Sequence, residues 1–224
     1  RQSGPSARAT AGARWGVSDV GDATSVDGLN YATAESDSSN LVTPYVFKQT
    51  AFFMKEKSIE PWYNSGQGNP PYERYDGAII NIGLAAIDSV CNDDDFMYFL
   101  GDDRKVYALR GSAAAVVKEI STQPMATEFA EYSTVSDAIG WPMLIEGKSF
   151  YVLTFPTENK TWVYCVGGEW FEWGSGTTGR NRANSYAFAF NKHLVADYQS
   201  GDIYELDKNT FTESGNEIIR LRDS

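Results

Sequence analysis

Short apolar runs separated by turn-forming residues fill most of this chain. From Gly28 onward, runs rich in Tyr, Phe, Val and Ile are broken every few residues by Gly, Asp, Asn or Pro. Runs of this kind are typical of short β-strands joined by tight turns. The best helix candidate, residues 126–132 (ATEFAEY), is long enough for a turn or two and follows Pro124 and Met125. The pattern therefore predicts an all-β protein.

Four segments repeat one plan, in which an apolar strand, a polar turn and a second strand with an aromatic residue follow one another. They are residues 45–64, 95–109, 149–166 and 192–206. Aligning Trp62, Tyr107, Tyr164 and Tyr204 gives spacings of 45, 57 and 40 residues. Repeats of about 40 to 50 residues are typical of β-propellers, in which each repeat forms one antiparallel blade. We therefore predict a β-propeller-like fold of about four blade-like units of antiparallel strands. A β-sandwich is the alternative, because strand pairing alone does not fix closure.

The beginning of the chain differs in texture from the rest. Residues 1–20 (RQSGPSARATAGARWGVSDV) are rich in Gly, Ala, Ser and Arg, which predicts a flexible N-terminal arm or linker. Residues 21–224 are predicted to form the propeller-like domain. The sequence does not begin with Met, and we expect it to be part of a longer protein. Within the domain, the polar segments 101–104, 156–160 and 199–202 predict hairpin turns between paired strands.

Charge and composition exclude several classes of function. The chain has 19 basic and 30 acidic residues, for a net charge of -11. A surface that grips a phosphate backbone needs the opposite sign, so we expect no sequence-specific nucleic-acid binding. No run of about 18 consecutive apolar residues occurs, and we therefore expect no membrane insertion.

The sequence offers little for metal or cofactor chemistry. Its soft ligands are Cys91, Cys165 and His193, too few for a structural zinc cluster. Two free thiols are favoured over one disulfide. The acidic clusters 93–95 and 102–103 match no calcium-binding loop and are interpreted as solvated turn carboxylates. We predict no metal site and no cofactor.

Catalytic motifs are missing as well. The sequence contains no G-x-S-x-G elbow, no phosphate-binding glycine loop and no dinucleotide fingerprint. Segment 158–162 (ENKTW) faintly resembles a sialidase turn, but the arginines are scattered and no carboxylate pair stands out. We therefore predict that the protein is not an enzyme and name no catalytic residue.

One aromatic loop is a candidate protein contact. Residues 60–72 combine aromatic residues with Pro, Gly and Asn and show no strand alternation. Loops with exposed aromatic anchors often carry binding. The candidate contact residues are Trp62, Tyr63, Pro70, Pro71 and Tyr72. A loop that merely folds back over its blade is an equally favoured interpretation.

The same region begins a resemblance to a known family. Residues 59–66 (IEPWYNSG), 71–74 (PYER) and 77–83 (GAIINIG), followed by 150–156 (FYVLTFP) and 161–164 (TWVY), resemble the packaged DNA stabilization proteins of P22-like short-tailed bacteriophages. The resemblance runs from about residue 28 to residue 206 in the family's order. It departs at Pro61, where the family has an apolar strand residue, and at Cys165, where an acidic residue is frequent.

The resemblance implies a non-enzymatic virion protein of the phage tail. It would act as a hub or head-to-tail connector below the portal, retain packaged DNA and help to mount other tail parts. The implied partners are the portal or adaptor ring, the tail needle and the tailspikes, with a homo-oligomeric ring in the virion and assembly in the cytoplasm of the bacterial host. The acidic net charge further predicts a negative lumen that repels DNA.

A carbohydrate-binding or glycoside-cleaving propeller used in host attachment is the alternative function. Its exposed Trp and Tyr side chains would be platforms on which sugars stack. A sugar site predicts aromatic residues clustered with carboxylates at one mouth of the propeller. A hub predicts broad patches and no deep pocket.

Overall fold

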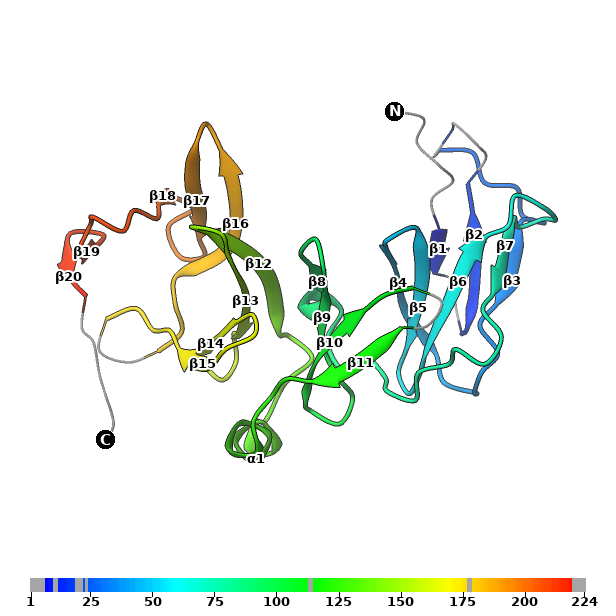
Figure 1. Ribbon diagram of the computed structural model, residues 1–224, viewed down its shortest axis with the longest axis horizontal. Coiled ribbons are helices and arrows are strands. Elements are labelled where there is room, and N and C mark those ends of the chain that lie inside the picture. The colour runs from blue at the N-terminus through cyan, green and yellow to red at the C-terminus, as the bar shows by residue number, and fades with distance from the viewer. Residues whose placement is uncertain are drawn as a thin grey trace.

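The computed structural model describes residues 7–9 (backbone), 12–18, 22, 24–112, 115–176 and 179–218. Within these ranges the chain folds into a series of small antiparallel sheets that follow one another in chain order (Figure 1). The first sheet contains β1 (Ala7–Ala9), β2 (Arg14–Val17) and β3 (Tyr31–Thr33). The second contains β4 (Leu41–Phe47), β5 (Thr50–Lys55), β6 (Ile59–Asn64) and β7 (Tyr72–Arg74).

The later sheets repeat this plan. The third contains β8 (Cys91–Asn92), β9 (Met97–Leu100), β10 (Val106–Arg110) and β11 (Val116–Glu119), preceded by a 3-10 turn, η1 (Ile87–Ser89). The fourth contains β12 (Ile139–Ile145), β13 (Lys148–Phe155), β14 (Lys160–Cys165) and β15 (Trp170–Glu172). The fifth contains β16 (Ala183–Ala189), β17 (Lys192–Asp197) and β18 (Ile203–Glu205), and a short hairpin of β19 (Thr212–Glu213) and β20 (Asn216–Glu217) follows.

The predicted repeat corresponds to the second to fifth of these sheets. The four aligned aromatic residues each lie on the third strand of their sheet, on β6, β10, β14 and β18. The predicted hairpin turns 101–104, 156–160 and 199–202 connect the second strand to the third in the last three sheets. The sequence-based prediction of an all-β, propeller-like fold is confirmed.

Four apolar clusters hold neighbouring sheets together, one at each junction. Strand β9 shows how the residues are divided. Met97 and Phe99 pack toward the second sheet, whereas Tyr98 and Leu100 pack toward the fourth. Successive side chains of a strand point to opposite faces, so a strand that is covered on both faces needs an unbroken apolar run. This explains the runs AFFM in β5, MYFL in β9 and YVLTF in β13.

The first sheet differs from the expectation of an unpacked arm over residues 1–20. Within that range β1 pairs with β2, and β2 pairs with β3. Trp15 has no exposed surface and stacks on Phe53 of the second sheet with 4.2 Å between ring centroids. One large aromatic ring buries enough apolar surface to hold a Gly- and Ala-rich segment in a strand. The division into an arm and one domain over residues 21–224 otherwise stays a prediction.

The helix α1 (Gln123–Glu131) is longer than the sequence predicted. It begins after Thr122, whose hydroxyl accepts a hydrogen bond from the backbone of Met125. Proline is tolerated in the first helical turn because the amide it lacks would have no intrahelical partner there. Met125 and Phe129 are buried against the third and fourth sheets. The helix therefore begins before Pro124, whereas the sequence predicts a start after Met125.

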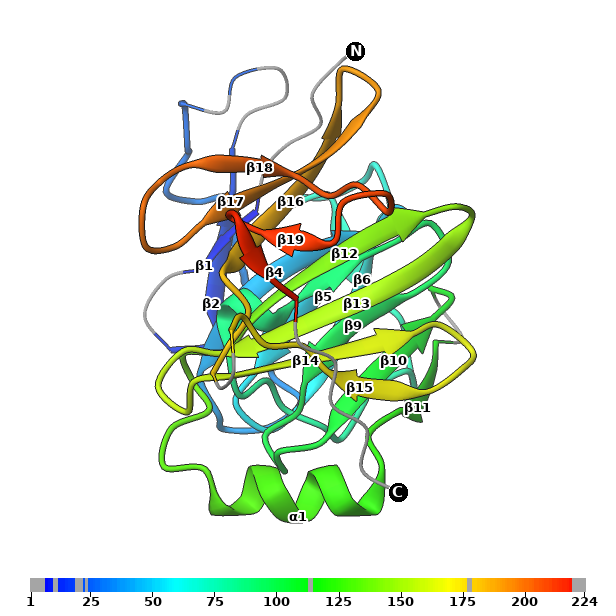
Figure 2. The same ribbon diagram turned by 90° about the vertical axis from the view of Figure 1, so that its left-hand side faces the viewer.

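The sheets form a curved row in which the first and fifth lie at opposite ends (Figure 1). Seen from one end, the sheets overlap one behind another and α1 runs along their edge (Figure 2). First strands lie beside one another where β1 meets β4 and where β12 meets β8 and β16. This is the radial arrangement of propeller blades. Within the described ranges, no helix has the length and apolar character that a membrane span requires.

Candidate interaction surfaces

The predicted contact loop is a hairpin in the structure. Residues 60–64 belong to β6 and Tyr72 begins β7, although burial along β6 does not alternate from residue to residue. Residues 65–71 connect the two strands, and the backbone amide of Ser65 donates to the carbonyl of Pro71 at 3.0 Å. This hydrogen bond joins the two ends of the connection between β6 and β7.

The five candidate residues divide into two groups. Trp62 and Tyr72 contact Trp15 edge-on, with ring centroids 5.2 and 5.8 Å away, and they help to pack the first sheet on the second. Tyr63 donates its hydroxyl to Glu73 at 2.7 Å, while Pro70 and Pro71 are half-buried. Trp62 and Tyr72 therefore serve the core, and Tyr63, Pro70 and Pro71 are the members left at the surface.

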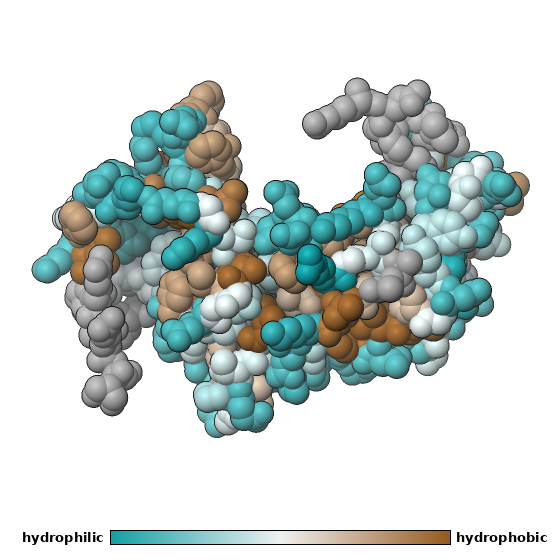
Figure 3. All heavy atoms as spheres, viewed as in Figure 1, coloured by the Kyte–Doolittle hydropathy of each residue, from teal (hydrophilic) through white to brown (hydrophobic). Residues whose placement is uncertain are grey.

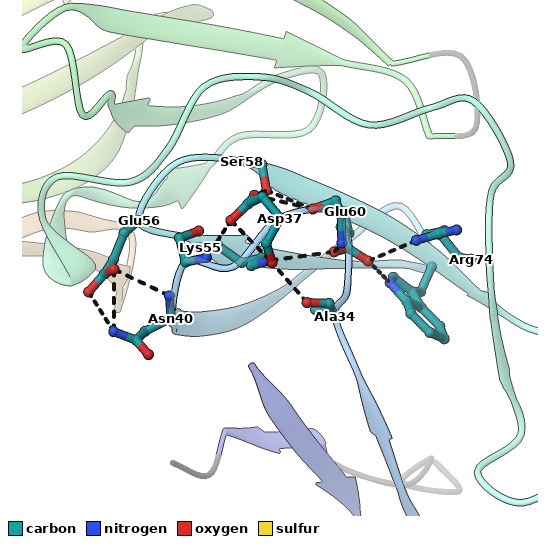
Figure 4. Close-up of polar contacts among 11 residues, drawn as sticks. Ala34, Asp37, Asn40, Lys55, Glu56, Ser58, Glu60 and Arg74 are labelled. Atoms are coloured by element: carbon teal, nitrogen blue, oxygen red, sulfur yellow. Dashed lines mark hydrogen bonds and ion pairs between the residues drawn. The ribbon is translucent and has the colours of Figure 1, made fainter. Parts of the chain in front are cut away.

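A buried charge cluster lies beside this hairpin (Figure 4). The side chains of Lys55 and Glu60 are fully buried, with 3.9 Å between Nζ and Oε1. Lys55 donates to the carbonyls of Ala34 and Asp37 at 3.0 and 2.6 Å, and its Nζ lies 3.3 Å from the Asp37 carboxylate. A buried charge is tolerated when partners of opposite charge and hydrogen bonds surround it. The cluster ties segment 34–40 to the second sheet.

The carboxylate of Glu60 also accepts several hydrogen bonds. Oε1 of Glu60 accepts from the backbone amide of Ser36 at 2.7 Å, and Oε2 accepts from the indole of Trp62 at 3.2 Å. Arg74 lies 3.8 Å from the same Oε2. Burial opposes ionisation of Asp37, but hydrogen bonds from Ser39, Ser58 and Lys55 outweigh it and hold the pKa of that carboxyl well below its usual range. The cluster is complete without a ligand.

The acidic turns do not form a metal site in the described part of the chain. Asp93 accepts hydrogen bonds from the amides of Asp95 and Phe96 and from the hydroxyl of Tyr98 at 2.8 Å. Burial, together with this bond to a carboxylate, raises the pKa of Tyr98. Among the described residues, no group of three or more His, Cys, Asp or Glu side chains is placed to hold a metal ion. These carboxylates fix turns.

The remaining soft ligands lie apart and have packing roles. Cys91 and Cys165 are both free thiols, as the sequence favoured, and burial raises the pKa of the Cys91 thiol. His193 lies half-buried with its Nδ1 2.7 Å from the hydroxyl of Tyr186, and its ring stacks on that of Tyr186.

Open grooves lie between neighbouring sheets. One of about 540 Å³ separates α1 and β11 from β14 and β15, and its wall includes Trp162, Tyr164 and Trp170. A second, of about 480 Å³, separates the fourth sheet from the fifth. We call the second one the apolar groove, because Met143, Ile145, Phe150, Val163, Phe171 and Trp173 line its fourth-sheet side. Both are wide and open to solvent.

Several large apolar side chains are exposed on and beside the fifth sheet, which the sequence did not predict. Phe190 is 91% exposed and Ile203 is 69% exposed, and the neighbouring Phe188 and Leu144 are exposed as well. Isolated exposed apolar residues are normal, but Phe188 and Phe190 lie on one hairpin and are a candidate interface. The signal was present in the sequence, since Phe190 stands at the turn of a hairpin where a polar residue is usual.

Two solved structures are similar to this chain. Hsv2 of Kluyvelomyces marxianus is similar in structure, with a TM-score of 0.48, 9% sequence identity, and 84% of this chain and 54% of that chain covered. The dihydro-heme d1 dehydrogenase NirN in complex with DHE gives a TM-score of 0.49 and 13% identity, covering 95% of this chain and 44% of that chain. The chain thus spans about half the length of these two structures.

Sequence comparison adds one match. No curated protein matches the chain. The model of one protein family, described as "Bacteriophage P22 Gp10, beta-propeller", matches residues 3–211. The match therefore covers the five sheets and ends close to the short hairpin of β19 and β20.

Proposed function

From the premise that the chain belongs to the bacteriophage P22 Gp10 family of β-propeller proteins, we propose that it is a hub or connector of the phage tail. Membership makes it a phage structural protein concerned with DNA stabilisation. The proposed role is to lie below the portal after DNA packaging, close the channel and carry other tail parts. The observation that supports this proposal is the family match over residues 3–211.

The mechanism that we propose is mechanical and non-enzymatic. The charged groups in the core, Lys55 and Glu60, neutralise each other and tie segment 34–40 to the second sheet. The grooves between sheets are wide and open, and such surfaces suit contact with other proteins better than they suit the enclosure of a small substrate. A stack of small sheets with one apolar cluster at each junction provides a stiff body that can transmit load.

Contacts with other tail proteins would use the surface of the molecule. We propose the portal or adaptor ring, the tail needle and the tailspikes as partners, and a homo-oligomeric ring as the assembled form in the tail. Tyr63, Pro70 and Pro71 at the β6–β7 connection are proposed contact residues, because they lie outside the core that Trp62 and Tyr72 help to fill. With a net charge of -11, a ring of such chains would present a negative lumen to DNA and repel it.

DNA retention is the direct test. Phage heads that contain the portal and are filled with DNA, but lack this protein, are incubated with the purified chain and then with nuclease. The expected result is that the chain increases the fraction of DNA that stays protected. An unrelated acidic β-propeller protein of similar net charge is the control. Equal protection by the control, or none by the chain, contradicts the proposal.

One observation supports a second candidate function, the binding of carbohydrate. The groove beside α1 brings Trp162, Tyr164 and Trp170 together with Glu128 and Glu169. Both indole N–H groups are fixed, one by the hydroxyl of Tyr132 at 3.2 Å and the other by the carbonyl of Ile120 at 2.6 Å. Aromatic faces next to carboxylates are the arrangement that a sugar site requires. Titration with the surface polysaccharide of the host, against a Tyr164→Ala variant, tests this candidate.

A further inference from the structure

The hairpin of β16 and β17 carries an aromatic side chain at its tip. Phe190 stands in the turn between the two strands and is 91% exposed, and Phe188 on the same hairpin is 57% exposed. The hairpin projects from the body of the molecule (Figure 1), and its tip is apolar in a largely polar surrounding (Figure 3). In the described part of the chain, no other large apolar side chain is exposed to so high a fraction. We call Phe190 with this turn the prong.

The backbone of the turn does not explain a phenylalanine there. Phe190 and Asn191 have φ angles of 54° and 59°. Two successive left-handed residues define the type I′ hairpin turn, in which Asn and Gly are preferred. Asn191 fits this preference, whereas a bulky aromatic residue with positive φ is strained. Since neither the turn nor the core accounts for Phe190, its side chain is free to serve an intermolecular contact.

A site that fits such a side chain lies on the same molecule. The apolar groove has a volume of about 480 Å³, and Asn191, next to the prong in sequence, forms part of its rim. Phe171 on the opposite wall is 45% exposed. Rigid aromatic anchors that enter a preformed apolar pocket contribute most of the affinity in many interfaces. The prong and the groove are therefore complementary in chemistry and lie side by side.

The charges around the groove are nearly balanced and so permit a second copy as the occupant. The chain carries a net charge of -11, so most pairs of surfaces from two copies repel each other. At the groove, Lys208 pairs with Glu146, and Lys192 pairs with Glu205 at 2.5 Å. Asp207 also lines the groove, which therefore has two basic and three acidic side chains, an imbalance far smaller than that of the whole chain. Two acidic chains can approach here with less repulsion than their net charge implies.

We propose that Phe190 of one copy inserts into the apolar groove of a second copy. The inference rests on the proposed function, because it supplies a contact between copies of the proposed ring. Because Asn191, next to Phe190, lines the groove, prong and groove form one patch, and such a patch suits reciprocal exchange between two copies. The anchor is Phe190 of each copy against the wall formed by Phe150, Phe171 and Trp173 of the other.

Site-specific photocrosslinking tests the contact directly. The photoreactive residue p-benzoylphenylalanine replaces Phe190 in the full chain, and equal amounts of light and ¹⁵N-labelled protein are mixed before irradiation. The expected result is crosslinks between light and heavy chains at residues 143–150 and 171–173. The same residue at position 211, where Phe211 is 68% exposed, is the control. Crosslinks confined to one chain, none in the groove, or the same pattern from position 211 would overturn the proposal.

A pair of variants gives a second, independent test. Phe190→Asn satisfies the turn better than the native residue and so keeps the fold, while it removes the anchor. Phe171→Ser changes an exposed residue of the receiving wall. Sedimentation equilibrium is expected to show self-association weakened at least about tenfold in either variant. If the Phe190→Asn variant self-associates as strongly as the wild type, the proposal is overturned. If crosslinks form but the chain does not retain DNA in filled heads, the contact is supported and the proposed function is rejected. If the chain retains DNA but no crosslinks form, the proposed function is supported and the contact is rejected.

Discussion

The second and fifth sheets have a similar strand plan but differ in how many of their faces are covered. Every residue of β5 is buried, because Phe52 and Met54 pack on the third sheet while Ala51 and Phe53 pack on the first. In β17 and its neighbours, Tyr186, Val195 and Tyr204 lie in one cross-strand row and pack toward the fourth sheet. The opposite face carries Ser185, Ala187, Leu194, Ala196 and Ile203, and no apolar cluster of the described residues includes them.

The second sheet therefore contributes more to stability, whereas the fifth sheet has more surface available for contact with another molecule. A sheet with two covered faces gains from burial on both sides, at roughly 25 cal/mol for each Å² of apolar surface removed from water. It also excludes any partner. Among the described residues, the fifth sheet gains on one side only, and its projecting turn is exposed. We therefore expect mutations to lower stability strongly in the second sheet and to alter association, with little loss of stability, in the fifth.

The largest effect is expected from truncating the centre of the second sheet. Phe53 has no exposed surface and stacks on Trp15 at 4.2 Å. Phe53→Ala leaves a cavity between two sheets and should lower the free energy of unfolding by about 3–5 kcal/mol. Urea unfolding followed by tryptophan fluorescence measures this. Leu194→Ala on the free face of the fifth sheet is the matched variant, and an equal loss there would contradict the comparison.

A smaller but still large effect is expected from the buried cluster. Lys55→Met keeps the volume of the side chain but leaves Glu60 without its buried cation, although Arg74 still lies 3.8 Å from it. Removing one partner of a buried ion pair costs about 3 kcal/mol or more. Lys192→Met breaks the Lys192–Glu205 pair of the fifth sheet, whose side chains are 52% and 42% exposed. Because exposed pairs contribute little, its urea midpoint should match that of the wild type. A Lys55→Met variant as stable as wild type would show that the cluster adds no stability.

The sequence predicted the covered sheets better than the rest. Runs such as MYFL indicate that both faces of β9 are covered. The aromatic residues on the third strands show how the repeats align with one another. The first sheet was missed because its one anchor, Trp15, is surrounded by small residues, and its burial depends on Phe53 from a distant part of the chain. For the same reason the contact role of Trp62 and Tyr72 could not be judged, since Trp15 is what they contact.

The exposed face could not have been predicted from local pattern alone. Segment 192–197 (KHLVAD) has apolar residues at successive positions, as a strand with two covered faces would. Whether the second face is covered depends on whether another sheet lies against it, and this is a property of the assembled fold. The buried pair Lys55 and Glu60 has the same difficulty, because charged residues at strand ends are usually exposed.

Acid should weaken the second sheet through Asp37. The folded-state pKa of this carboxyl is below its ordinary value of 3.8. Its ionised form therefore contributes stability above that pH, and the contribution is lost as the pH falls through the lower, folded-state pKa. Asp37→Asn should cost about 1–2 kcal/mol at neutral pH, because it weakens hydrogen bonds to a charged group. It should also make the fall in urea midpoint between about pH 6 and about pH 3 shallower. Asp202→Asn, at an exposed turn of the fifth sheet, is the control and should keep the wild-type slope.

The smallest expected effect has the opposite sign and concerns the prong. If Phe190 serves association and not the fold of the monomer, a residue that suits its φ of 54° should stabilise the chain. Phe190→Asn should raise the free energy of unfolding by about 0.5–1 kcal/mol, since Asn tolerates the left-handed region with less strain. Asn191→Phe places the aromatic ring at the second turn position and should lower stability by a similar amount. Loss of stability in Phe190→Asn, measured by urea unfolding of dilute monomer, would show that the ring belongs to the core of its own chain. The fifth sheet, like the second, would then use its large apolar side chains for the fold of the monomer and not for association.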